Sequence, residues 1–298
     1  MRAMGRTRGV EEGAMSWRTY QVIFRLRSPL HIGHGKVGNL QRTRSYVTGR
    51  ALWGAVTMRL TRDIFRGRGP VSDSREYRKM GNQVHQLLAF TYFYPALKKE
   101  NNYCVEWPWE DEGAFRRRFL SGYQGAALVY PERSAAEGML HEVEFISPYT
   151  LDTCEPVFFK GYVFEKKGCN LNWQSAFRRL QIGGERGYGW GDVELVDASP
   201  AKDEHIFGDF VTVQGDSERP IVHLSTNARL LAHTHAASNL RVSGDIEPLV
   251  GREWRSDNLR YRYAGQHVEF SRVCFVPGSI VHENLTFIVK EYGIWVAT

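Results

Sequence analysis

The sequence is poor in cysteine and has no long apolar run. Its four cysteines, among 298 residues, stand far apart and form no CxxC pair, which argues against a structural zinc site and a secreted disulfide framework. No apolar run approaches the roughly 18 residues that a membrane span needs. The polar residues 1–16 lack the apolar centre of a signal peptide. We therefore expect a cytoplasmic protein with reduced thiols, a disordered tail over 1–16 and no membrane partner.

Acidic residues are nearly absent from one stretch near the N-terminus. Between Arg18 and Arg68, eleven Arg or Lys side chains stand against a single carboxylate, that of Asp63. In a chain with a formal net charge of +6, such a window indicates an anionic partner, and nucleic acid is the commonest one. A solvated, arginine-rich surface is the alternative.

Hydrophobic periodicity predicts an α+β chain. Residues 19–33 begin with alternating apolar and polar side chains, which predicts a half-buried strand. Thr48 is placed to cap a helix over 49–65. The apolar positions of that helix that recur at helical spacing are Leu52, Ala55, Val56, Leu60 and Ile64. Residues 67–82 are polar and turn-rich, as in a linker or an insertion.

The second half of this region repeats the pattern. Residues 139–150 and 157–166 alternate and predict two strands, which we expect to be antiparallel neighbours. Residues 172–184 predict a helix that ends at Gly183 or Gly184, and 192–198 predict a strand. A further short helix is expected near 115–120, and its "FRRRF" arginines either reach phosphates or form a solvated face.

The order of these elements approximates β-α-β-β-α-β, a ferredoxin-like (RRM-like) module with insertions over 17–198. We expect its first and last strands to be the central pair of the sheet. This would place the loop after the first strand beside the loop before the last. Residues 199–298 are β-rich, and form either a small second domain or an extension that covers the first sheet.

A glycine-rich loop, "LQIGGERGYGWGDVEL", precedes the last strand of that module. The loop is not a P-loop, because it has no Lys followed by Ser or Thr. It is not a Rossmann loop, because the helix comes before it and the strand after it. It is not a kinase glycine loop, because the chain has no HRD or DFG motif. The remaining functional interpretation is a loop that clamps a polyanion through close backbone approach, an arginine and a stacking ring. A tight helix-to-strand turn is the alternative. The candidate RNA-binding residues here are Gly183, Gly184, Arg186, Gly187, Tyr188, Gly189 and Trp190.

Two segments carry a family resemblance. Residues 46–54, "YVTGRALWG", fit the pattern Y-[IV]-x-G-[SR]-x-[LI]-[KRW]-G at the start of a helix, after a strand that ends in a glycine-containing turn. Residues 182–195, "IGGERGYGWGDVEL", form a glycine-rich loop before a final strand. Both resemble the RAMP (repeat-associated mysterious protein) superfamily of CRISPR-associated proteins, over about 18–65 and 170–197. The resemblance implies ferredoxin-like modules and binding of CRISPR RNA within an effector ribonucleoprotein.

Three roles are open within that superfamily. Backbone subunits of type III effectors typically carry an Asp after the first strand that cuts target RNA, but residues 31–49 contain no Asp or Glu. Processing endoribonucleases often use a histidine near the first helix as general acid or base, for which His31 and His34 are the candidates. A subunit that caps the 5′ handle of the CRISPR RNA needs a basic groove and no nucleophile.

The sequence of residues 42–55 most resembles that of a capping subunit, so the capping role is our leading hypothesis. It implies a type III effector subunit without catalysis, metal or cofactor, whose partners are CRISPR RNA, other RAMP subunits and the large subunit. Besides the glycine loop, the residues expected to contact RNA are His34, Lys36, Arg42, Arg44 and Arg50. The alternatives are a metal-independent endoribonuclease that uses His31 or His34, a backbone RAMP subunit, and a protein-interaction module whose basic face is incidental. A metal site could be formed by His223, His233, His235 and Asp245, but surface or hydrogen-bonded histidines are the preferred interpretation.

Overall fold

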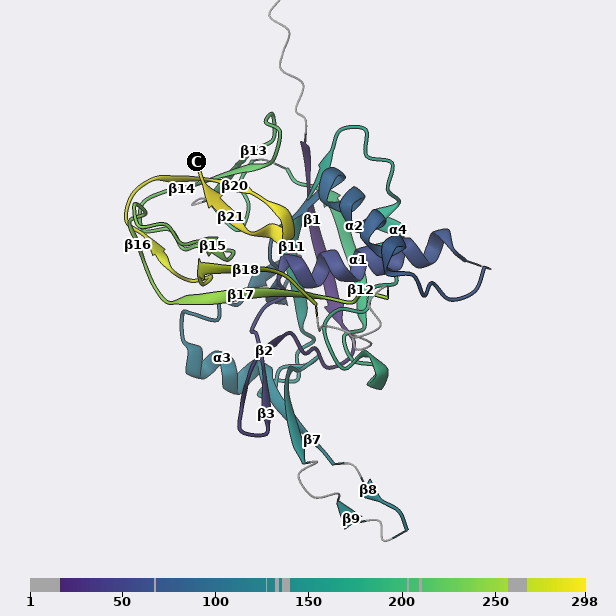
Figure 1. Ribbon diagram of the computed structural model, residues 1–298. Coiled ribbons are helices and arrows are strands. Elements are labelled where there is room, and N and C mark those ends of the chain that lie inside the picture. The colour runs from purple at the N-terminus through teal and green to yellow at the C-terminus, as the bar shows by residue number, and fades with distance from the viewer. Residues whose placement is uncertain are drawn as a thin grey trace, which may run out of the picture.

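The chain folds as an α+β protein with several β-sheets and few helices (Figure 1). The computed structural model describes residues 17–66, 68–126, 128–131, 134–135, 140–202, 204–208, 211–256 and 267–298. The expected tail over 1–16 lies outside these residues. Among the described residues, no helix combines the length and the apolar character needed to cross a membrane.

The first sheet contains the strands on which the sequence-based topology depends. Its members are β1 (Trp17–Leu26), β4 (Leu88–Phe90), β5 (Tyr94–Lys99), β6 (Asn102–Val105), β11 (Phe158–Lys166) and β12 (Val193–Pro200). They run in the order β12-β1-β11-β5-β6, with β4 also paired to β11. The expectation that the first and last strands form the central pair is wrong, because β12 lies at the edge. Since Leu26 pairs with Val193, the end of β1 still meets the start of β12.

Helix α1 follows most of its prediction. The helices are α1 (Gly49–Ile64), α2 (Ser74–Leu87), α3 (Glu112–Phe119) and α4 (Trp173–Phe177), with single turns η1 (Arg186–Tyr188) and η2 (Glu291–Gly293). The Thr48 side chain accepts the N–H of Ala51 as expected, and Leu52 and Leu60 are buried. Ile64 is 58% exposed instead. Each four-residue step advances about 40° beyond a full helical turn, so three steps carry position 64 away from the face of Leu52.

Two of the expected element boundaries are wrong. The predicted linker over 67–82 contains the start of α2, where the Asp73 side chain accepts the N–H of Arg75. Met80 and Val84 are the main apolar side chains that this helix buries. They are four residues apart and lie on one helix face, a periodicity that the interpretation of 67–82 as a polar linker overlooked. Helix α4 ends at Phe177, several residues before the glycines that were expected to end it.

A second, separate sheet has four strands. Its strands are β2 (Gly33–Val37), β3 (Leu40–Thr43), β7 (Leu120–Gly125) and β10 (His141–Ile146), in the order β2-β3-β10-β7. The strand expected over 139–150 therefore pairs with β7 and β3 and not with β11, which corrects our expectation. In Figure 1, β7 and the short strands β8 (Leu128–Val129) and β9 (Ser134–Ala135) extend away from the body of the molecule.

The third sheet is built from residues after 210. Its strands are β13 (Val211–Gln214), β14 (Ile221–Leu224), β15 (Thr234–His235), β17 (Ile246–Glu253), β18 (His267–Phe275), β20 (Leu285–Val289) and β21 (Trp295–Ala297), while β16 (Val242–Ser243) and β19 (Ile280–Val281) form a separate pair. Val163 of β11 belongs to the same core cluster as Val84 of α2. Its neighbour Phe164 belongs to a second core cluster, which also contains Phe287 of the third sheet. The third sheet thus shares a core with the first one, and a boundary between separate domains at 198/199 stays a prediction.

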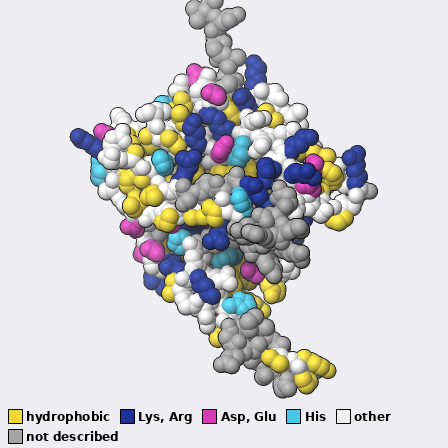
Figure 2. All heavy atoms as spheres, in the orientation of Figure 1, with side chains coloured by type: hydrophobic (Ala, Val, Ile, Leu, Met, Phe, Trp, Pro, Cys, Tyr) yellow, Lys and Arg dark blue, Asp and Glu magenta, His cyan; other side chains and the backbone are white. Residues whose placement is uncertain are grey.

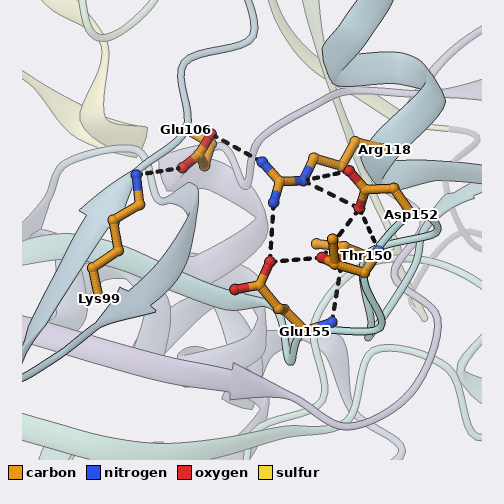
Figure 3. Close-up of polar contacts among 7 residues, drawn as sticks. Lys99, Glu106, Arg118, Thr150, Asp152 and Glu155 are labelled. Atoms are coloured by element: carbon orange, nitrogen blue, oxygen red, sulfur yellow. Dashed lines mark hydrogen bonds and ion pairs between the residues drawn. The ribbon is translucent and has the colours of Figure 1, made fainter.

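Helix α3 is held to the body by ion pairs of its arginines. Arg118 lies among the carboxylates of Glu106, Asp152 and Glu155, at 3.8, 3.1 and 3.0 Å (Figure 3). Arg116 forms an ion pair with Glu144. Two of the three "FRRRF" arginines are therefore neutralised by described carboxylates, which fits neither of the two expectations for this segment.

Candidate functional site: an arginine-lined groove

A groove of about 1200 Å³ runs along helix α1. It is larger than a typical small-molecule pocket of about 300–1,000 Å³, so it suits a chain-like ligand. Its walls come from the loop after β1, the glycine loop, α2, η2 and strand β17. Six arginines and one carboxylate line it: Arg44, Arg50, Arg62, Arg78, Arg186, Arg252 and Glu253. In Figure 2, Lys, Arg and His side chains gather on the face that carries α1 and β17.

The carboxylate of α1 does not neutralise the groove. Asp63 accepts hydrogen bonds from Arg59, at 2.8 Å, and from Arg179, at 2.7 Å. Arg62, one position earlier on the helix, lines the groove and has no carboxylate partner within the described part of the chain. The single acid of the basic N-terminal window is therefore used outside the groove, and Arg62 keeps its charge available.

Arg186 of the glycine loop faces the same helix. Its guanidinium donates to the Met58 sulfur, at 3.0 Å, which is a weak acceptor. Burial lowers the pKa of Arg186, and the nearby charge of Arg62 lowers it further. Two like charges, those of Arg186 and Arg62, therefore lie close together. Among the described residues, the Arg186 guanidinium contacts a thioether and not a carboxylate. An anion bound between the two arginines would relieve this repulsion.

The glycine loop lies against the loop after β1, as the sequence predicts. The N–H of Gly184 donates to the carbonyl of His31, at 2.8 Å. Gly183 has φ +85°, and a Cβ there would collide with that same carbonyl; Gly191 has φ +78°, and its Cβ would collide with the carbonyl of Ile182. These two glycines thus have a structural reason, since only glycine tolerates both the left-handed backbone and the close approach. A backbone clamp on RNA stays a prediction.

His31 and His34 both line the groove. Nδ1 of His31 donates to the carbonyl of Glu144, at 2.7 Å, so Nε2 of this neutral tautomer is the unprotonated nitrogen. Nδ1 of His34 lies 3.6 Å from a carboxylate oxygen of Glu247, a contact that is an ion pair only when His34 is protonated. Burial and the charge of Arg44 lower the pKa of His34, while Glu247 opposes them. Both imidazoles are thus oriented by a defined partner.

Glu247 of β17 joins the third sheet to the loop after β1. It accepts a hydrogen bond from Arg44, at 2.7 Å, and another from Nε2 of His233. Nδ1 of His233 contacts the hydroxyl of Tyr92, at 2.6 Å. Burial raises the pKa of Glu247, but the hydrogen bonds from His233 and Arg44 outweigh it and bring the pKa down to about 2. His233, discussed above as a possible metal ligand, is fully buried within this hydrogen-bonded network.

The groove includes some of the residues that the sequence predicts for RNA binding and leaves others outside. Those that line it are His34, Arg44, Arg50, Gly183, Gly184 and Arg186, together with the alternative catalytic candidate His31. Those outside its lining are Lys36, Arg42, Gly187, Tyr188, Gly189 and Trp190.

Several of these residues have other surroundings. Lys36 and Arg42 belong to the β2–β3 hairpin. Trp190 packs against Phe145, with ring centroids 5.0 Å apart, and Tyr188 is 74% exposed. The guanidinium of Arg44 is engaged with Glu247. Direct contact of these residues with RNA stays a prediction.

Sequence reasoning did not connect α2 or β17 with the groove. Arg78 comes from the segment interpreted as a linker, while Arg252, Glu253 and Trp254 come from a segment some 200 positions beyond α1. The Arg50 side chain donates to the carbonyl of Arg252, at 2.7 Å. The arginine and the tryptophan in "REWR" were the only local signals, and they do not show which surface they face.

No family model matches the chain, and no curated protein matches it. The solved structures to which the chain is similar include three chains of one kind of complex. A chain of the type III-B Cmr-beta complex bound to cognate target RNA has 10% identity and a TM-score of 0.36, over 59% of this chain and 96% of that one. A chain of the complex bound to target RNA and AMPPnP has 12% identity and a TM-score of 0.47, over 88% of this chain and 85% of that one. A chain of the apo complex has 10% identity and a TM-score of 0.36, over 62% and 98%. Likenesses at this level do not by themselves assign the chain to a family.

Proposed function

We propose that this chain is an RNA-binding subunit of a type III CRISPR effector ribonucleoprotein that holds the 5′ handle of the CRISPR RNA. The observation that carries the proposal is the arginine-lined groove along α1. Both segments that resemble the RAMP superfamily contribute to it, through Arg50 and Trp53 on one side and Gly183 and Arg186 on the other.

The charge of the groove suits a single-stranded polyanion. Arg62 and Arg186 lie close together without a described carboxylate between them, and Arg78 extends the charge toward α2. Arginine pairs readily with phosphate because its planar fork matches two phosphate oxygens. Other RAMP subunits and the large subunit of the effector are the partners that this role requires.

The strand order supports a ferredoxin-like module. The order β12-β1-β11-β5, with α1 after β1 and α4 between β11 and β12, agrees with two β-α-β halves joined in one antiparallel sheet. In such a module the groove lies over a helix and the two loops at one end of the sheet. An RNA chain can enter it there from solvent.

A second function is favoured by the two groove histidines. Nδ1 of His31 is held by the Glu144 carbonyl, which leaves Nε2 for proton transfer, and His34 lies beside the carboxylate of Glu247, so the pair has the chemistry for general acid–base catalysis of attack by a 2′-hydroxyl. This alternative is a metal-independent endoribonuclease that processes CRISPR RNA.

One experiment separates the two functions. Repeat-containing RNA is incubated with the protein in EDTA, with His31→Ala and His34→Ala in parallel, and binding is measured on the 5′ handle and on a scrambled RNA. The capping function predicts tight binding of the handle and no cleavage. Specific cleavage that either substitution abolishes would refute capping in favour of the endoribonuclease. A protein that binds neither RNA at low salt would refute both and favour a protein-interaction module.

A further inference from the structure

We propose that the α2 end of the groove binds an unpaired RNA base against the rings of Tyr77 and Trp254. This inference rests on the proposed RNA-binding function and deepens it, because it identifies where a base is bound as distinct from where phosphates are held. Both rings line the groove. Their centroids lie 6.1 Å apart at an interplanar angle of 78°, so the two rings form a corner.

Trp254 is unusual among the tryptophans of the chain. All eight lie in described residues, and Trp254, at 37%, is the only one among the exposed large side chains. An indole ring exposed in a concave basic groove is a typical stacking surface for a base, since every base has a π-face. The charge needed for the flanking phosphates is close by, because Arg252 is also part of the groove lining.

The corner is held rigidly from both sides. The N–H of Ser74 donates to Oγ of Ser256, at 2.9 Å, and the N–H of Ser256 donates to Oγ of Ser74, at 3.0 Å. This reciprocal pair fixes the segment after β17 to the start of α2. The Tyr77 hydroxyl donates to the carbonyl of Val71, at 3.2 Å. A site ordered before binding loses little conformational entropy when a base enters it.

Two exposed polar side chains of α2 complete the site. Arg78 and Asn82 line the same end of the groove, and their spacing of four residues places them on one helix face. The Asn82 amide offers both a donor and an acceptor, which matches the mixed edge of a base. Arg78 has no ion-pair partner among the described residues, so it is available to a flanking phosphate. The sequence-based expectation of stacking on Tyr188 or Trp190 concerned rings that do not line this groove.

Abasic substitution in the RNA tests the inference without altering the protein. Handle RNAs with one abasic nucleotide at each position in turn are titrated against the wild-type chain, Trp254→Ala, Trp254→Phe and the matched control Tyr130→Ala, whose ring is exposed and lies outside the groove lining. We expect one abasic position to weaken wild-type binding roughly 5- to 150-fold, the usual range for one stacked base. Trp254→Ala should weaken binding of intact RNA by a similar factor and be insensitive to that abasic position. Trp254→Phe should restore most of the affinity, and Tyr130→Ala should not change it.

The outcomes distinguish this inference from the proposed function. If no abasic position affects the wild-type chain, or if the losses from Trp254→Ala and the abasic nucleotide simply add, the base site is refuted while RNA binding by the arginines stands. A wild-type chain that binds no RNA at low salt overturns the proposed function and the base site together.

Discussion

Replacing Glu247 by alanine tests how β17 is held as a wall of the groove. The side chains of Glu247 and Arg44 are 16% and 11% exposed, and that of His233 is fully buried. The substitution removes the carboxylate that accepts hydrogen bonds from Arg44 and His233. It leaves the Arg44 guanidinium and the His233 N–H without this acceptor. Breaking a buried ion pair in this way costs about 3–5 kcal/mol. We therefore expect the free energy of unfolding of Glu247→Ala to fall by that amount near neutral pH.

The same carboxylate gives a pH signature. Its pKa lies at about 2 in the folded chain, against an ordinary value of 4.5, a difference that corresponds to about 3 kcal/mol. Because the folded pKa is the lower one, this stability is fully present above pH 4.5 and is lost as the pH falls from there toward 2. The difference in stability between wild type and Glu247→Ala should therefore shrink in acid.

Urea unfolding, followed by tryptophan fluorescence at about pH 7, 5 and 3.5, measures both effects. Glu283→Ala is the control, because its pair with Arg241 spans 3.9 Å and is exposed, and such pairs contribute about 0–1 kcal/mol. A Glu247→Ala protein that unfolds within about 1 kcal/mol of wild type at pH 7, or a difference that does not change with pH, would refute this account of the network.

Two further predictions concern the glycine loop and the thiols. Gly183→Ala should lower the stability by more than about 1 kcal/mol in thermal unfolding, because of its positive φ and the collision with His31. Gly187→Ala should not, because a Cβ at this position meets open space. Equal effects of the two substitutions would contradict this. Burial raises the pKa of the Cys274 thiol in β18 to about 11. At mildly alkaline pH a thiol reagent should therefore label the exposed Cys154 well before Cys274. Mass spectrometry of the peptides measures the order, and equally fast labelling of the two thiols would contradict the burial of Cys274.

Local patterns in the sequence predicted those parts of the fold that depend on local interactions. The alternation in β1, the Thr48 cap and the buried positions Leu52 and Leu60 follow from side-chain periodicity and capping alone. The meeting of the loop after β1 with the glycine loop was also predicted, because it requires only that β1 and β12 be neighbours and not that both be central.

The remaining features depend on contacts between distant residues. Alternation marked β10 as a strand but carries no information about its partner, so its pairing with β7 was missed. Glu247 and Trp254 reach the groove from the third sheet, about 200 positions after α1, and no spacing rule links such positions. Arg44 lines the groove, but its engagement with Glu247 was visible only in three dimensions.

The salt dependence of RNA binding is the most direct test of the claim that the groove along α1 holds RNA. For single-stranded RNA, the logarithm of the affinity falls with the logarithm of salt concentration by about 0.7 for each phosphate neutralised. The account predicts that Arg62→Ala combined with Arg186→Ala lowers the magnitude of this slope by about 1.4, while Arg241→Ala, which is exposed and outside the groove lining, leaves it unchanged. An unchanged slope in the double variant, or the same reduction with Arg241→Ala, would contradict it.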